Sequence, residues 1–211
     1  MHPTIATTIQ SLAGQTIAQR PSPADLVDAL LDAEKQTRKQ RFELTYKQLL
    51  GTWQLRFITG IKRSRQKAGM ALGAGRFIPP WLVRIQIQYS LPDSPESTLT
   101  NGLASEQLSS EFGVVRNSVQ LGLLTLALSG PTRLWSKSNR LAFDFTHVEV
   151  AIAGKTVYQG AARGGDKRTQ DFASQKLKDQ AFFTYFFVEE DAIAARGRGG
   201  GLALWTKVKP D

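Results

Sequence analysis

Cysteine is absent from this chain of 211 residues, and histidine is nearly so, since only His2 and His147 are present. Without cysteine there can be no disulfides, thiolate nucleophiles, zinc–thiolate sites or iron–sulfur clusters. One internal histidine leaves little for a Ser-His-Asp triad, and no His, Asp and Glu residues share metal-ligand spacing. We therefore expect no metal, no catalytic residues and no enzymatic activity.

Long apolar runs are also missing. No stretch approaches the roughly 18–20 apolar residues that a membrane-spanning helix needs, and the N-terminus lacks the pattern of a signal peptide. The segment before Asp25 has no acidic residue and is rich in Thr, as transit peptides are, but an amphipathic helix explains it better. The length suits one domain with its own core and a helical appendage.

Acidic residues are the minority charge, and the formal net charge is +9. A basic balance fits nucleic acid, anionic lipid headgroups or acidic partners. The excess is local, because the segment from Gly51 to Leu91 has no acid. Its basic residues are Arg56, Lys62, Arg63, Arg65, Lys67, Arg76 and Arg84.

The first part of the chain has helical periodicity. Apolar residues near one face predict a helix over 4–19, which Arg20-Pro21 ends. A second helix should begin at Ser22-Pro23, because Ser is a good N-cap and Pro fits the first helical position. Its apolar stripe consists of Leu26, Val27, Leu30 and Leu31, and it should end near Gln40. We expect residues 1–48 to form a helical segment that packs on the following domain.

After Gly51 the period changes to two, which indicates half-buried strands. The clearest runs are Trp53-Leu55-Phe57 and Val83-Ile85-Ile87-Tyr89 at alternate positions. Further strand-like runs are Val119 to Leu128, Leu141 to Ile152, Phe182 to Val188 and Leu202 to Val208, and 169–180 suggests a short helix. Strands with short links predict that residues 49–211 form an antiparallel sandwich or barrel.

Two motifs stand at opposite ends of the strand region. The first strand opens with Gly51-Thr52-Trp53, and Arg196-Gly197 precedes the final strand. First and last strands are neighbours in a closed barrel, so the guanidinium of Arg196 could lie over the Trp53 indole, a contact worth about 0.5–2 kcal/mol. We expect Gly51, Trp53, Arg196 and Gly197 to close the barrel.

The order helix, G-x-W, strands, R-G and last strand resembles the plastid lipid-associated proteins, or fibrillins. Matching segments are 49–55 and 187–191 with Arg196-Gly197, and less sharply 112–117 and 141–145; the family's first tail arginine is missing at Ala192-Ile193. The resemblance implies a lipocalin-like (calycin) β-barrel with N-terminal helices. It also implies carriage of a prenylquinone, carotenoid or fatty acid at thylakoid membranes or lipid bodies, on the cytoplasmic side in a cyanobacterium or in a plastid.

Side chains that point into such a barrel are the candidate ligand contacts, with ordinary core packing as the alternative. They are Trp53, Leu55, Phe57, Val83, Ile85, Ile87, Tyr89, Phe143 and Phe145. No cofactor other than a bound lipid, quinone or carotenoid is expected.

The segment 60–80 combines basic and apolar residues with several glycines. Basic residues beside apolar ones suit an anionic membrane surface, and this segment would form the lid of a lipocalin-like barrel; a solvated loop is the alternative. The candidate lid or membrane contacts are Lys62, Arg63, Arg65, Lys67 and Arg76.

Two other functions use the same features. The basic charge could bind nucleic acid, but no RNA-binding motif is evident, so we expect no nucleic-acid partner. Asp144, His147 and Glu149 lie on one strand-like run, and related barrels serve bilin lyases and some cyclases. An enzyme of that kind is the first alternative to a lipid carrier.

Overall fold

The structure is a computed structural model that describes residues 3–13, 21–40, 42–60, 75–92 and 111–209. Its helices are α1 (Pro3–Ala13), α2 (Pro23–Gln40), α3 (Tyr46–Leu49) and α6 (Gly165–Asp171). Single 3₁₀ turns follow at Ser136–Ser138, Phe172–Ser174 and Leu177–Asp179. The strands are β1 (Gly51–Ile58), β2 (Arg76–Phe77), β3 (Arg84–Ser90), β4 (Phe112–Leu121), β5 (Leu124–Trp135), β6 (Arg140–Phe143), β7 (His147–Ile152), β8 (Lys155–Ala161), β9 (Ala181–Val188), β10 (Ala192–Gly197) and β11 (Leu202–Lys207).

Antiparallel pairing closes eight of these strands into a barrel, which confirms the predicted fold class. The ring runs β4-β3-β1-β11-β10-β9-β6-β5, and the pairing of β4 with β5 completes it. The first and last strands are neighbours as predicted, with Trp53 opposite Lys207 and Leu55 opposite Trp205. β2 is a short addition to the end of β1.

Strand β5 takes part in two sheets. Its second half pairs with β6 inside the ring, and its first half pairs with β7, to which β8 is added. The chain leaves the ring between Phe143 and His147, where the backbone of Asp144 crosses Gly130 so closely that a Cβ there would lie 2.2 Å from the Asp144 carbonyl oxygen. Glycine is therefore required at the point where the sheet divides.

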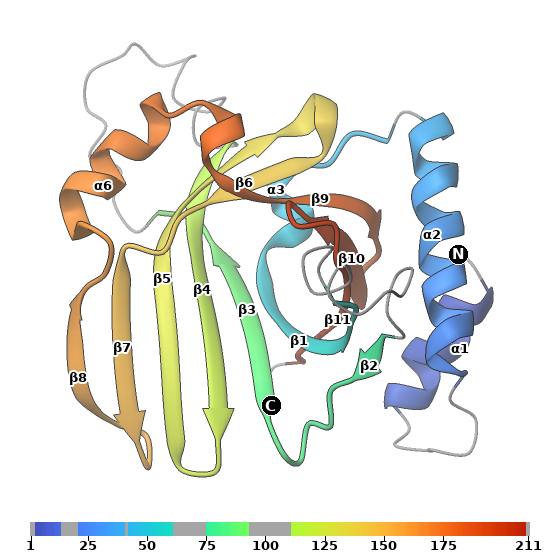
Figure 1. Cartoon of the computed structure of the whole chain (residues 1–211), viewed down its shortest axis with the longest axis horizontal. Helices are drawn as coiled ribbons and strands as arrows, with labels where there is room; N and C mark the ends of the chain where they lie inside the picture. The colour runs from blue at the N-terminus through green and yellow to red at the C-terminus, as the bar shows by residue number, and fades with distance from the viewer. Residues whose placement is uncertain (1–2, 14–20, 41, 61–74, 93–110, 210–211) are drawn as a thin grey trace.

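The result is a sheet extension that continues the wall of the barrel (lower left in Figure 1). We define the sheet extension as residues 84–87 of β3, 117–121 of β4 and 124–129 of β5, with all of β7 and β8. Helix α6 follows β8 and leads the chain back to β9 across the division.

The opposite end of the barrel is plugged by residues 42–50. Leu44, Tyr46 and Leu49 are buried in the same core cluster as the inward side chains of the strands. The Tyr46 hydroxyl lies 2.7 Å from that of Thr132 on β5, and the amide of Asn139 donates to the carbonyl of Phe42 at 2.7 Å. The last part of the segment 1–48, which was expected to pack on the barrel as a helical segment, therefore contributes side chains to the barrel core.

The two long N-terminal helices pack on the outer surface of the barrel. Their buried stripe, which includes the predicted Leu26, Val27 and Leu30, contacts outward residues of β9, β10 and β11. The predicted start of α2 is confirmed, because the Asp25 amide donates to Ser22 Oγ at 3.2 Å. The first helix is described only to Ala13, so the rest of its predicted span lies outside the described residues.

Other expectations need correction. The run 119–128 is not one strand, because a hairpin turn with Gly122 at φ +57° divides it into β4 and β5. The run 141–152 is likewise broken at 144–146 by the division of the sheet. Strand β8 escaped notice because its residues lack clear alternation. Among the described helices, none is long and apolar enough to cross a membrane.

Candidate functional site

Most of the predicted cavity residues do point into the barrel. Trp53, Leu55, Ile87, Tyr89 and Phe143 are buried in the inner core cluster, and Ile85 and Phe145 pack against it from partly buried positions. They share this cluster with Val115, Leu134, Leu141, Tyr185, Ile193, Ala195, Ala203 and Trp205. These residues form the apolar interior of the closed part of the barrel.

The prediction that Phe57 lines the interior of the barrel is wrong. A β-bulge between Leu55 and Phe57 shifts the register, so that Phe57 stands opposite Leu204 and faces the helices outside the barrel. There its ring makes an edge contact with Phe77 at 5.1 Å between centroids. Val83 precedes β3 and lies in a turn, where its amide donates to the Pro79 carbonyl at 3.1 Å.

The interior continues onto the sheet extension without a change of face. Because cross-strand partners share a face, Ile85 opposite Val119, Val119 opposite Leu126, and Leu126 opposite Val150 all belong to the side that lines the barrel. We call this side the apolar face. It consists of Ile85, Val119, Leu121, Leu124, Leu126, Leu128, Val148, Val150, Ile152 and Tyr158.

This apolar face is largely uncovered. Leu126 is 41%, Ile152 49% and Tyr158 55% exposed, whereas Val115 and Leu134, farther along β4 and β5, are buried in the barrel. Contiguous exposed apolar surface marks an interaction site in a folded protein. The sheet extension thus offers an apolar platform that leads to the mouth of the barrel.

The reverse side of the sheet extension is polar. It presents Gln86, Ser118, Gln120, Thr125 and Gln159, together with a two-point ion pair in which Arg116 donates to both oxygens of Glu149 at 3.0 and 3.1 Å. Hydrogen bonds from Arg116 lower the pKa of Glu149. The contrast between the two sides shows which one is available to apolar partners.

One polar side chain interrupts the apolar row along β4. Asn117 lies between Ile87 and Leu128 at the junction of barrel and sheet extension, on the inward side. It is half-buried, and its amide has no hydrogen-bond partner in the part of the chain that the structure describes. Lipophilic sites characteristically contain a few such polar groups among apolar ones. The resemblance matched residues 112–117 to a middle strand of the family, but alternation predicted a strand only from Val119, and Asn117 was therefore not named as a candidate.

Deeper in the barrel, Tyr89 and Tyr185 share a buried hydroxyl–hydroxyl contact of 2.7 Å. Burial raises the pKa of both phenols well above the usual value, and it raises the pKa of Tyr46 to about 12. These tyrosines are therefore neutral at physiological pH. Only one of the two hydroxyl hydrogens can be used in the contact between Tyr89 and Tyr185. The other hydroxyl hydrogen has no acceptor among the described groups.

Gly51 and Trp53 lie in the first part of β1, where Trp53 stands opposite Lys207 of the last strand. Gly51 has φ +114°, a conformation that favours glycine. The fully buried Trp53 indole donates from Nε1 to the Leu49 carbonyl at 2.7 Å. The cation near its ring is the Lys207 ammonium, 5.0 Å from the ring centroid.

Arg196 is not that cation, so its predicted contact with Trp53 is wrong. On β10, Ala195 points inward and Arg196 outward, where its Nε donates to Glu34 of α2 at 2.9 Å and its Nη1 to the Gly200 carbonyl at 2.7 Å. Burial raises the pKa of Glu34, but hydrogen bonds and charge from Arg196 and then Arg38 outweigh it, so the pKa is lowered. Arg196-Gly197 thus ties a helix to the barrel, and Gly197 pairs with Phe183 at a φ that is not positive.

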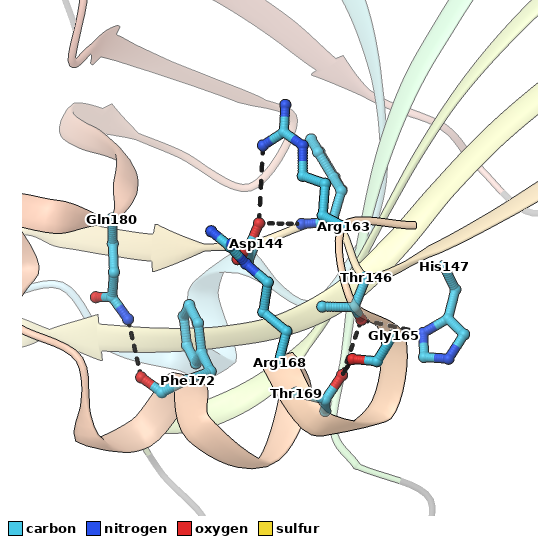
Figure 2. Close-up of polar contacts among 10 residues, drawn as sticks. Asp144, Thr146, His147, Arg163, Gly165, Arg168, Thr169, Phe172 and Gln180 are labelled. Carbon is cyan, nitrogen blue, oxygen red and sulfur yellow. Dashed lines mark hydrogen bonds and ion pairs between the residues drawn. The ribbon is translucent and has the colours of Figure 1, made fainter. Parts of the chain in front are cut away.

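Two residues of the enzyme alternative, Asp144 and His147, form contacts that hold α6 over the division of the sheet (Figure 2), whereas Glu149 pairs with Arg116 of β4. The buried Asp144 accepts a hydrogen bond from Arg168 and lies 3.9 Å from Arg163 Nη1. His147 Nδ1 lies 3.0 Å from Thr146 Oγ1, and its Nε2 lies 3.1 Å from Asp166 on α6. Asp144, His147 and Glu149 therefore have three different partners and do not converge on one point.

Of the predicted lid residues, only Arg76 is described. It is exposed on β2 and pairs with Ile58 of β1. Lys62, Arg63, Arg65 and Lys67 lie outside the described residues.

No family model and no curated protein matches this chain. Among solved structures, a redesigned β-barrel is 10% identical with a TM-score of 0.33, covering 79% of this chain and 95% of its own. A protein of unknown function from the DUF3598 family of Nostoc punctiforme is 12% identical with a TM-score of 0.29, covering 80% of this chain and 51% of its own. At these values neither neighbour informs the function of this chain.

Proposed function

We propose that this protein binds and carries a lipophilic molecule without transforming it. The observation that supports this function is the apolar face, which continues the inner surface of the barrel onto the sheet extension and leaves it uncovered. An elongated apolar molecule on this face would cover leucine, valine and tyrosine side chains that otherwise contact water. Burial of apolar surface contributes about 25 cal/mol per Å², so even partial coverage gives useful affinity.

The polar groups suggest how such a molecule would be oriented. Asn117 stands at the mouth, and its amide, which has no partner among the described residues, can donate to a carbonyl or accept from a hydroxyl. A ligand with one polar end and a long apolar body would place that end at Asn117 and its body along the apolar face. The resemblance to fibrillins implies a prenylquinone, a carotenoid or a fatty acid. Prenylquinones, fatty acids and those carotenoids that carry oxygen substituents have this form.

The resemblance also motivates the proposed location, a peripheral position on thylakoid membranes or lipid bodies. A carrier of a membrane-soluble metabolite must exchange it with a lipid phase. The excess of basic residues is compatible with an anionic lipid surface.

The binding test is a titration of the full chain with cis-parinaric acid, a fluorescent fatty acid, followed by emission. We expect saturable binding to the unaltered protein. Leu126→Asn should weaken it about tenfold or more, since a buried leucine contributes about 1.5–3 kcal/mol. Leu91→Asn is the matched control, because Leu91 is 49% exposed but follows β3 at the other end of the barrel.

Mass spectrometry of an organic extract of protein purified from its native host identifies the natural ligand. A prenylquinone, carotenoid or fatty acid in stoichiometric amount would support the proposal. An empty extract together with no saturable binding of the probe would refute it, and so would equal losses in Leu126→Asn and Leu91→Asn.

A further inference from the structure

Three turns lie side by side where the strands of the sheet extension end, away from the closed part of the barrel. The turn 79–83 leads into β3 beside the end of β4, because Arg84 pairs with Gln120. The β4–β5 turn contacts the β7–β8 turn directly, since the Ala153 amide donates to the Leu123 carbonyl at 2.8 Å. Figure 1 shows these turns along the lower edge of the molecule. We call residues 79–83, 121–124 and 152–155 the turn edge.

The turn edge carries the two most exposed large apolar side chains of the described structure, Trp81 and Leu123. Trp81 is 83% exposed, Leu123 70% and Leu82 54%. Leu121, Leu124 and Ile152 add to the same edge. Turns in contact with water normally carry polar residues and glycine. This concentration of large apolar side chains therefore indicates a surface that binds a partner.

Charge indicates which partner. The turn edge is flanked by exposed basic residues, Arg76 on β2, Arg84 at the start of β3 and Lys155 at the start of β8. The only acidic residue of β3, β4, β5, β7 and β8 is Glu149, which lies on the polar side and is neutralised by Arg116. An apolar edge with a cationic border and no anion matches a bilayer with acidic headgroups, where tryptophan also prefers the interface.

We propose that the turn edge docks on an anionic lipid bilayer, with Trp81, Leu82 and Leu123 inserted at the level of the headgroups and Arg84 and Lys155 on the surface charge. In this orientation the apolar face opens toward the acyl chains. The docking stands on the exposed turns alone, whereas the passage of a ligand from bilayer to barrel rests on the proposed function.

A second copy of the chain fits the turn edge less well. Dimerisation through the sheet extension would bury residues in the middle of the apolar face, such as Leu126 and Val150, against their counterparts. It would leave Trp81 and Leu123 at the rim, because both lie in turns at the strand ends. A curved row of apolar turns instead presents all of its tips to a fluid surface at once.

The experiment is flotation of the full chain with vesicles of phosphatidylcholine, with and without phosphatidylglycerol. We expect binding to the anionic vesicles and a blue shift of tryptophan emission that Trp81→Phe abolishes while retaining binding. The pair Trp81→Ser and Leu123→Ser should lower the partition coefficient about tenfold or more, since large apolar side chains no longer enter the interface. Arg84→Gln with Lys155→Gln should lower it by a similar factor at low salt.

Leu91→Ser is the control, an exposed leucine at the opposite end of the barrel, and it should bind as the unaltered protein does. Unchanged binding of the Trp81 and Leu123 variant, or an equal loss in Leu91→Ser, would overturn the proposal. The proposal would also be overturned if the unaltered protein were a dimer that the Trp81 and Leu123 variant dissociates, while vesicle binding stayed the same. The turn edge would then be the contact surface for a second copy of the chain.

Titration of the same variants with cis-parinaric acid separates the two proposals. The Trp81 and Leu123 variant should keep its probe affinity, because neither side chain belongs to the apolar face. Vesicle binding that depends on the turn edge, in a protein that binds no probe, would sustain the docking and refute the carrier function. Probe binding without vesicle binding would support the carrier function and refute the docking.

Discussion

A single indole joins three parts of this molecule. Trp53 lies fully buried inside the first strand, donates to the carbonyl of Leu49 in the plug, and stands opposite Lys207 of the last strand. Trp53→Ala should lower the free energy of unfolding by about 3–5 kcal/mol, the usual cost of truncating a large buried aromatic residue. Urea denaturation monitored by circular dichroism measures this loss.

Trp81→Ala is the control for that measurement. Trp81 is 83% exposed, so its loss should change stability by no more than about 0.5 kcal/mol. A loss below about 1 kcal/mol for Trp53→Ala would contradict the assigned burial.

Glu34 gives a residue-scale prediction with a pH dependence. Its pKa is lowered in the folded protein by Arg196 and Arg38, so the stabilisation is fully present above the unfolded-state value of about 4.3. It is lost as the pH falls through the folded-state value. The stability difference between the unaltered protein and Glu34→Gln should therefore be largest near neutral pH and shrink in acid, as urea denaturation at several pH values would show.

The two arginines that contact Glu34 differ in burial, so substituting each one compares a partly buried ion pair with an exposed one. The Arg196 side chain is 22% exposed and the Arg38 side chain 75%. Arg196→Ala should cost about 1–3 kcal/mol because it leaves a buried carboxylate without its main partner, whereas Arg38→Ala should cost no more than about 0.5 kcal/mol. Equal effects would show that the helix is not tied to β10 through this pair.

At the scale of elements, the division of the sheet depends on close backbone contact at Gly130. In Gly130→Ala the new Cβ would lie 2.2 Å from the Asp144 carbonyl oxygen, so β5 and the 144–146 segment must separate, at a cost of about 1–3 kcal/mol. Gly60→Ala is the control, because a Cβ there meets nothing within 4 Å. Thermal unfolding of both variants tests this, and equal melting temperatures would reject a tight crossing at Gly130.

The elements also show what the sequence could and could not predict. Alternation identified β1 and β3, and the Ser22-Pro23 signal placed the start of α2, because each depends on neighbours along the chain. The β-bulge that turned Phe57 outward depends on the pairing of β1 with β11, which leaves no local mark. The turn at Gly122 was missed because apolar residues flank it on both sides, where turns normally carry polar ones.

The candidate site is less predictable than the strands that form it. Inward alternation was enough to select Ile85, Ile87 and Tyr89, but the apolar face also requires β7 and β8 to leave the ring, which Gly130 and the contacts of Asp144 bring about. Asn117 gains significance only from its position at the junction. Arg196 was wrongly assigned to the Trp53 ring because its actual partner, the carboxylate of Glu34, is distant in sequence.

At the scale of the whole molecule, the packing of the helices on the barrel predicts that both unfold as one unit. Leu26 and Leu30 of α2 are fully buried against outward residues of the barrel that include Phe186 and Leu204. Thr37 adds a hydrogen bond of 2.6 Å to the Phe186 carbonyl. A chain that begins at residue 42 would expose this entire outer apolar surface, and we expect it to aggregate or to lose its cooperative unfolding transition.

A chain that begins at residue 22 provides the graded comparison, because it lacks α1 but retains α2. It should remain soluble with a lowered melting temperature, since the buried side chains of Ile5 and Ile9 are lost while the contacts of Leu26 and Leu30 with the barrel persist. Calorimetry and size-exclusion chromatography of the three chain lengths measure the trend. If the chain from residue 42 melts cooperatively at the temperature of the full chain, the helices are an independent appendage and the barrel folds without them.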